Sequence, residues 1–235
     1  FFTAFCWMGT VWTLFFFRKA WQLESWQVGV LAWVLIGSGW IPFLGMEAYL
    51  FAFLLLLSVS LFLDDRYYVA GFGAGLLFLT RGEGVLVLSV LVIAALVSDW
   101  VADKTLEIGL LRKPLNLTIG SAFPVLLWFV YAQFTFGSFL PHTLAAKQAQ
   151  RQSALWRPFL QRLIHEWMPL WGRLFKFGAS PFFNLWWIIV LIGLADVLIR
   201  RRRWLILVGW IILYILGYTI LNVSAYWWYQ LPILF

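Results

Sequence analysis

Long apolar runs, interrupted by short charged stretches, follow one another along almost the whole chain. Such runs predict helices, because a bilayer interior offers backbone groups no partners outside the helix itself. We expect eight membrane-spanning helices, at residues 1–17, 27–44, 48–63, 67–80, 85–98, 115–136, 181–199 and 204–222. The fourth and fifth runs are shorter than the roughly 17–25 residues that cross a bilayer. We therefore expect them to form a short or broken pair that meets at residues 80–84.

The composition supports the same interpretation. The 235 residues are 63% apolar, 20% aromatic and 11% charged, whereas soluble domains are about 45–50% apolar and about 25% charged. This excludes a soluble globular domain, a disordered tail and a disulfide scaffold. The single Cys6 also excludes a disulfide or a thiolate metal site. We expect an all-α, polytopic bundle that forms one transmembrane domain over residues 1–235 and is surrounded by membrane lipids.

The basic residues predict the orientation of this bundle. Ten of the 17 lysines and arginines lie beside helix ends in short connections, and alternating spans bring all of them to one face: Arg18, Lys19, Arg66, Lys104, Arg112, Lys113 and Arg200–Arg203. Short basic connections are typical of the cytoplasmic side. The net charge of +7 therefore reports topology and does not indicate nucleic-acid binding. Asp196, four residues before Arg200, is expected to form a local ion pair with it.

The opposite face is predicted to carry residues 45–47, the stretch 81–83 and a long segment from about 137 to 180. Within that segment, aromatic and aliphatic residues alternate with Arg and Lys between 155 and 177. This pattern indicates a basic amphipathic helix in the membrane interface, interrupted near Pro169. Within the fourth run, Gly71, Gly73 and Gly75 predict close helix packing.

Two acids and one arginine on the outer face are candidates for chemistry. Glu47 is open to two interpretations: a hydrated helix N-terminus, or a carboxylate that lines an outward cavity and binds sugar hydroxyls. Arg81 breaks the positive-inside pattern and lies two residues before Glu83. It either pairs locally with Glu83 or faces an anionic group such as a lipid phosphate.

Further candidates lie nearer the C-terminus. Gly137 and Pro141 predict a turn, after which His142 and Lys147 could touch a phosphate or a sugar, although a lone His is also typical of a hydrated loop. Tyr229 belongs to an aromatic stretch at 226–232 that reads as an interfacial belt or as a sugar-stacking wall. We find no hydrolase triad, phosphate-binding loop or dinucleotide motif. No metal site or cofactor is proposed, and the residues argue neither for nor against a divalent ion.

Three motifs recur in an order that resembles a known family. They are Gly45-Met46-Glu47, Leu79-Thr80-Arg81-Gly82-Glu83-Gly84, and Phe136-Gly137-Ser138-Phe139-Leu140-Pro141-His142-Thr143 followed by Lys147. Together they resemble the multi-span glycosyltransferases of the GT-C superfamily, especially bacterial arabinofuranosyltransferase-type members and relatives of the protein mannosyltransferases.

The resemblance implies an enzyme of the bacterial plasma membrane whose active site faces outward. Such an enzyme moves a sugar, with inversion, from a polyprenyl-phosphate donor to a glycan, lipid or protein acceptor. Arg81 and Lys147 would hold the donor phosphate. Glu47, Glu83, His142 and Tyr229 would lie near the substrate.

The chain departs from the family pattern at several points. Gly82 stands where relatives usually have Pro, and His142 stands where they have Asn, so the donor sugar and the role of His142 stay open. The family's catalytic acid lies in its first outer loop. The chain starts and stops within apolar runs, so we expect a fragment that lacks this loop, and we assign no general base. The alternatives are a transporter or lipid flippase, or a non-catalytic membrane subunit.

Overall fold

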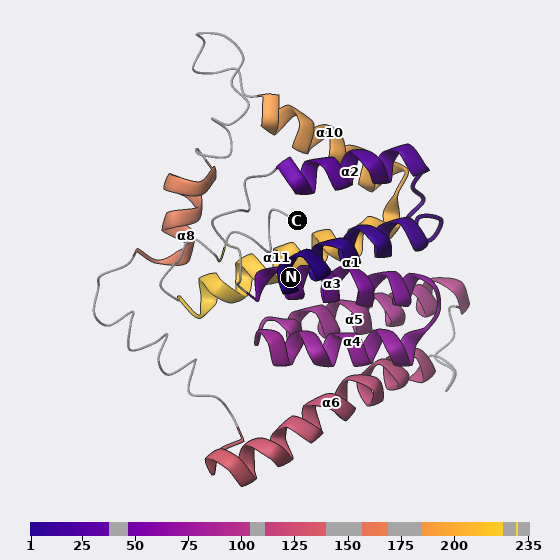
Figure 1. Cartoon of the computed structure of the whole chain (residues 1–235). Helices are drawn as coiled ribbons and strands as arrows, with labels where there is room; N and C mark the ends of the chain where they lie inside the picture. Colours follow the sequence, from indigo (N-terminus) through magenta and orange to yellow (C-terminus); the bar gives the residue numbers. More distant parts are fainter. Residues whose placement is uncertain (38–46, 104–110, 140–156, 169–184, 223–228, 230–235) are drawn as a thin grey trace. The chain divides into compact units, whose positions relative to one another are not determined.

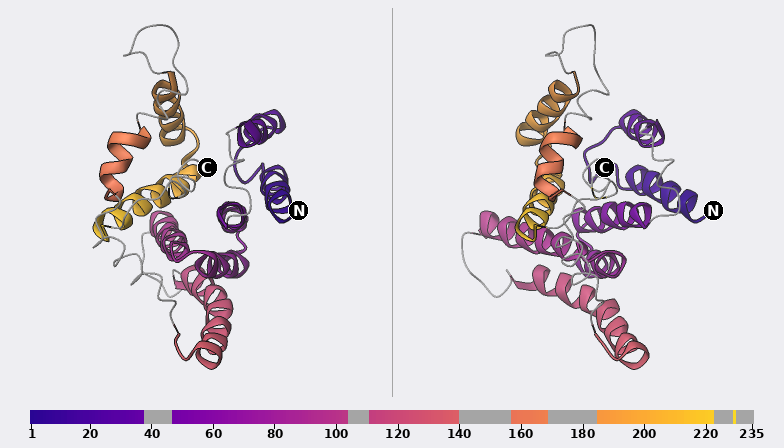
Figure 2. Two further views of the ribbon diagram at one scale, coloured as in Figure 1. Left: turned by 60° about the vertical axis from the view of Figure 1, so that its left-hand side comes forward. Right: turned by 90° about the vertical axis from the view of Figure 1, so that its left-hand side faces the viewer.

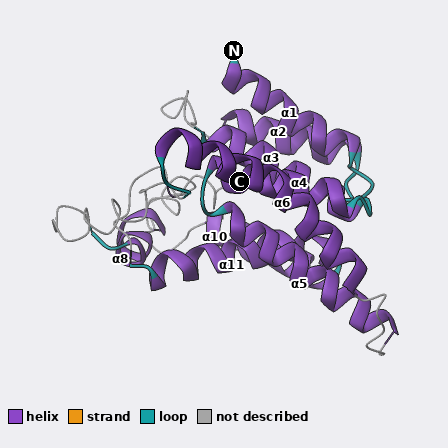
Figure 3. Ribbon diagram, turned by 90° about the horizontal axis from the view of Figure 1, so that it is seen from below, coloured by secondary structure: helices purple, strands orange, loops and turns teal. Residues whose placement is uncertain are grey.

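The computed structural model describes residues 1–37, 47–103, 111–139, 157–168, 185–222 and 229, and the regular elements within them are all helices (Figure 3). This confirms the all-α prediction. The chain divides into two compact units: residues 1–140 with 234–235, and residues 141–233. Each unit is described by itself below. A single transmembrane domain over the whole chain stays a prediction.

Unit 1 contains the first six predicted helices. They are α1 (Phe2–Phe16), α2 (Ser25–Gly37), α3 (Ala48–Leu63), α4 (Tyr67–Thr80), α5 (Gly84–Asp103) and α6 (Arg112–Phe136). From α1 to α6 the helices run back and forth (Figure 1). The connections after α1 and α3, and the start of α6, therefore lie at one end of the unit, and the turn between α4 and α5 lies at the other. Arg18, Arg66 and Arg112 share the first end, as the charge pattern predicts.

Among the described helix ends of unit 1, the end of the fifth helix differs most from its predicted position. The fifth helix was expected to end at residue 98 and to match the short α4, but α5 continues to Asp103 and is 20 residues long. The apolar run stops at Ser98, whereas backbone hydrogen bonding tolerates polar residues at a helix end. Hydrophobicity therefore marked the end of the apolar stretch rather than the end of the helix. Of this predicted pair, only α4, with 14 residues, is short.

The most extensive contact between two helices of unit 1 is that of α4 with α6, which lies at the edge of the unit (Figure 2). A Cβ atom at Gly71 would lie 2.1 Å from the carbonyl oxygen of Leu117, and one at Gly120 would lie 2.1 Å from that of Tyr68. At Gly73 a Cβ would lie 2.4 Å from the hydroxyl of Ser58 on α3. The glycines thus let α4 touch two neighbouring helices, which confirms the close packing predicted from their spacing.

Unit 2 contains α8 (Phe159–Arg162), the π-helix η3 (Leu163–Trp167), α10 (Leu185–Ile199), the 3-10 helix η4 (Arg202–Trp204) and α11 (Leu205–Ile220). The last two predicted apolar runs are thus helical. Of the predicted amphipathic helix at 155–177, residues 159–167 are helical and bury Phe159, Leu163 and Trp167 at four-residue intervals. Residues 140–156 and 169–184 lie outside the described part, so Pro169 and most of the outer segment stay untested.

The predicted local ion pair of Asp196 is confirmed, but its partner is not Arg200. The Asp196 carboxylate instead lies 3.0 Å from Nε of Arg201. The helix α10 ends at Ile199, and Arg201 adopts a non-helical backbone conformation with φ −115° and ψ 52°. This change of direction carries the Arg201 side chain back to the carboxylate. Helical four-residue spacing therefore no longer applies at this point.

Two helices in the described part of the chain are long and apolar enough to cross a membrane. They are α6, at Arg112–Phe136, and the stretch Arg202–Ile220 that joins η4 to α11. The other apolar helices measured over described residues are shorter, with 10–17 residues. Eight membrane spans were expected. The length and composition of the described helices support two of them.

Candidate functional site

The turn between α4 and α5 positions two of the predicted site residues. Arg81 leaves the helix in an extended conformation, with φ −150° and ψ 136°. The N–H of Gly84 then donates to the carbonyl of Arg81 at 2.8 Å, and α5 begins. A Cβ at Gly84 would lie 2.2 Å from the backbone nitrogen of Phe78. Only glycine therefore lets α5 start so close to the last turn of α4.

Three charged side chains meet beside this turn. The Nη1 atom of Arg81 lies 3.3 Å from Oε1 of Glu47. The Nε and Nη2 atoms of Arg81 each lie 3.4 Å from a different oxygen of Glu83. These distances exceed the roughly 2.7–2.9 Å of a strong charge-assisted hydrogen bond. The cluster therefore joins the start of α3 to the turn between α4 and α5 through long, adjustable contacts.

The two carboxylates differ in how far they are buried. Arg81 is 8% exposed and Glu83 is 9% exposed, whereas the side chain of Glu47 is 47% exposed. A buried charge is costly unless it is paired, and Glu83 supplies that pairing through both of its oxygens. Glu47 is the partner that faces solvent. An incoming group can therefore replace Glu47 at Arg81 at a lower cost than Glu83.

The contacts bear on the interpretations left open for these residues. The local ion pair between Arg81 and Glu83 is confirmed. Glu47 stands at the N-terminus of α3 with a half-exposed side chain, as the hydrated helix N-terminus predicts. Its carboxylate makes no side-chain cap hydrogen bond and also pairs with Arg81. Among the described contacts, one guanidinium thus faces two carboxylates.

Three predicted site residues remain, namely His142, Lys147 and Tyr229. His142 and Lys147 fall outside the described residues. Tyr229 belongs to unit 2, where it is 3% exposed. Its carbonyl accepts a hydrogen bond of 3.0 Å from the hydroxyl of Tyr214, and its ring centroid lies 4.9 Å from that of Tyr218. Tyr229 thus forms part of the aromatic core of unit 2.

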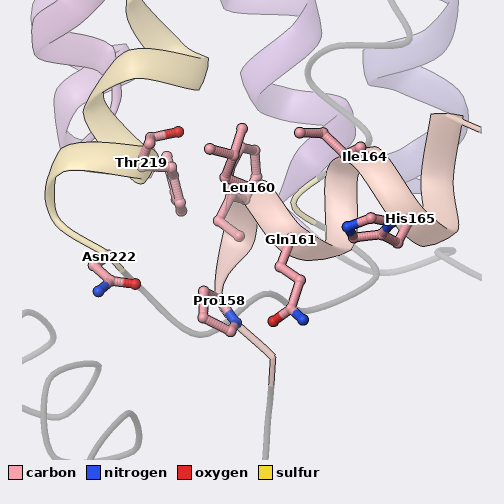
Figure 4. A pocket seen from close by; sticks show the side chains of 9 residues that line it. Pro158, Leu160, Gln161, Ile164, His165, Thr219 and Asn222 are labelled. Carbon is pink, nitrogen blue, oxygen red and sulfur yellow. The ribbon is translucent and has the colours of Figure 1, made fainter.

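A pocket in unit 2 was not predicted from the sequence. It has a volume of about 430 Å³ and lies between α8, η3 and the end of α11 (Figure 4). The polar side chains of Gln161, His165, Thr219 and Asn222 line it. These residues come from two segments more than fifty positions apart, so no local pattern could have indicated the pocket. In the described part of the chain, no group of three or more His, Cys, Asp or Glu residues could hold a metal ion.

Comparison with known proteins finds no match. No protein family, curated protein or solved structure is significantly similar to this chain.

The turn at Gly84 yields a testable expectation. A Gly84→Ala substitution should lower the stability by about 1–3 kcal/mol, because the added methyl overlaps the backbone of α4. Gly82→Ala is the matched control. A Cβ at Gly82 would meet no atom within 4 Å, so this change should be neutral or slightly stabilising. Thermal unfolding of both variants in detergent measures the difference, and equal melting temperatures would contradict the close approach of α5 to α4.

Proposed function

We propose that the protein is a polytopic membrane glycosyltransferase that uses a polyprenyl-phosphate sugar donor and acts at the outer face of the membrane. One observation carries this proposal: Glu47 and the pair Arg81–Glu83, which belong to two separate motifs of the resemblance, form a single cluster. The cluster lies at the end of unit 1 opposite the basic connections (Figure 1).

Exposed apolar side chains support membrane insertion, and we propose eight spans. On α6, Phe134 is 87% exposed and Leu126 is 59% exposed, and on α1 Trp12 is 61% exposed. Soluble proteins rarely expose such extended apolar surface, whereas lipid tails cover it without cost. In this arrangement the basic connections face the cytoplasm, and the cluster around Arg81 faces outward.

The charges of the cluster suggest how the donor binds. The donor phosphate takes the place of Glu47 at the Nη1 atom of Arg81, while Glu83 keeps the guanidinium in position. The released carboxylate of Glu47 then accepts hydrogen bonds from sugar hydroxyls. Lys147 supplies a second cation at the phosphate in this proposal.

The reaction is an inverting displacement. An acceptor hydroxyl attacks the anomeric carbon, the new glycosidic bond forms, and the bond from that carbon to the phosphate oxygen breaks. The bonding electrons leave with the polyprenyl phosphate, so negative charge grows there in the transition state. Arg81 stabilises this charge electrostatically. We assign no residue of this chain as the base that accepts the hydroxyl proton.

A transfer assay tests the function directly. The complete protein in vesicles, given a polyprenyl-phosphate sugar and candidate glycan, lipid and protein acceptors, should release polyprenyl phosphate and form a glycosylated product. Movement of the intact donor across the bilayer without transfer would instead identify a lipid flippase. If neither sugar transfer nor movement of the donor is detected, the protein is instead a non-catalytic membrane subunit.

The location of the cluster can be tested with a single cysteine. Gly82 is exposed and has open space around it, so Gly82→Cys in a Cys6→Ala background should be tolerated. In intact cells we expect a membrane-impermeant maleimide to label this cysteine. Lys19→Cys, at an exposed position in a basic connection, is the control and should react only after the membrane is opened. Labelling of Gly82→Cys only from the cytoplasmic side would overturn the proposed active site.

A further inference from the structure

An apolar groove runs between α1 and α2 in unit 1. Its volume is about 550 Å³, and its wall includes Trp7, Val11, Trp12 and Phe15 of α1 and Val28 and Gly29 of α2. A Cβ at Gly29 would meet no atom within 4 Å. The space next to α2 is therefore open to a further apolar group.

One end of this groove is cationic. Phe15 and Ser25, the lining residues nearest the connection between the two helices, lie at this end. The guanidinium of Arg18 lies over the ring of Phe15, 4.9 Å from its centroid, and its Nη1 donates to the carbonyl of Phe15 at 3.1 Å. Lys19 is exposed beside it. The connection contains these two cations and one acid, Glu24, so its net charge is positive.

The length of the groove fits a lipid chain. Along the groove wall, from Trp7 to Phe15, the helix rises about 12 Å. One leaflet of the hydrocarbon core is about 15 Å thick, half of about 30 Å. A groove of this length, open at a cationic end, therefore fits an acyl chain from a single leaflet.

We propose that this groove is a phospholipid site, with one acyl chain along α1 and α2 and the phosphate held by Arg18 and Lys19. The negative surface potential of the cytoplasmic leaflet favours an anionic lipid at this end. The inference rests on the membrane insertion in the proposed function, and it does not require sugar transfer.

Photo-crosslinking tests this site. The complete protein in phosphatidylcholine nanodiscs receives a trace of phosphatidylglycerol with a photoactivatable acyl chain, and crosslinked peptides are identified by mass spectrometry. Crosslinks should map to the groove-facing residues of α1 and α2. Gly29→Phe should remove most of them by filling the open space. The matched control is Gly193→Phe on α10, where a Cβ also meets no atom within 4 Å, and it should leave the labelling unchanged.

The role of the cations needs a second comparison. Arg18→Gln combined with Lys19→Gln should lower labelling by the phosphatidylglycerol probe about tenfold, because two charge-assisted contacts are lost. A diacylglycerol probe with the same chain but no phosphate should label the wild-type groove weakly and should not respond to these changes. Equal labelling by both probes, labelling of Gly29→Phe at the wild-type level, or no crosslinks in the groove would overturn the proposal. Loss of sugar transfer with groove labelling intact would count against the proposed function alone.

Discussion

A double variant, Arg81→Gln with Glu83→Gln, is expected to remain folded and yet to transfer sugar at least about 100-fold more slowly than the wild type. Removing only one partner of a buried ion pair leaves an uncompensated charge and costs about 3–5 kcal/mol. Both residues are less than a tenth exposed. Arg81→Gln alone should therefore destabilise unit 1 most, because it leaves Glu83 buried without Arg81. Glu83→Gln alone should cost less, because Arg81 keeps Glu47, and the neutral pair should regain most of the lost stability.

Stability and transfer are measured on the four members of this double-mutant cycle, by thermal unfolding in detergent and by the vesicle assay. The exposed pair of Arg66 and Asp64, at 2.8 Å, is the matched control. Neutralising both of its members should change the stability by less than about 1 kcal/mol and should leave transfer unchanged. Full transfer by the double variant at Arg81 and Glu83 would remove Arg81 from the mechanism. A double variant that is as unstable as the single ones would mean that the amides do not replace the ion pair.

The second large effect is expected where α4 crosses α6. Gly71→Ala and Gly120→Ala should each destabilise the protein by about 3 kcal/mol, the upper end of the usual cost of overpacking. In both cases the new methyl would meet a backbone carbonyl at 2.1 Å, and a backbone atom cannot move aside as a side chain can. The two helices would have to separate along their whole contact.

Thermal unfolding in detergent again gives the measurement, with Gly29→Ala as the control. Gly29 also lies within a helix, but a Cβ there would meet no atom within 4 Å. Alanine at this position should be neutral or should stabilise the protein by about 0.5–1 kcal/mol. If Gly71→Ala and Gly29→Ala were equally stable, the close contact between α4 and α6 would be contradicted.

Local sequence determined most of the helical architecture. The bounds of α3 and α4, at Ala48–Leu63 and Tyr67–Thr80, coincide with the predicted apolar runs, because a charged turn follows each run at once. The end of α5 was missed because helical hydrogen bonding continues past the last apolar residue. The spacing of Gly71, Gly73 and Gly75 predicted close packing, but it did not identify Leu117 and Ser58 as the neighbours.

The candidate site was only half visible in the sequence. Arg81 and Glu83 are two residues apart, so their pairing follows from local geometry and could be predicted. Glu47 is 34 residues from Arg81, and only the packing of α3 beside α4 brings the two together. The same holds for the aromatic core that contains Tyr229 and for the groove beside Gly29.

Hydrophobic runs and charges thus determined which segments are helical and at which end the basic connections of unit 1 lie, because both depend on neighbours along the chain. The tertiary structure decided which carboxylates hold Arg81, which backbones touch and where open space remains. Those features depend on how helices distant in sequence pack against one another, and periodicity contains no information about that packing.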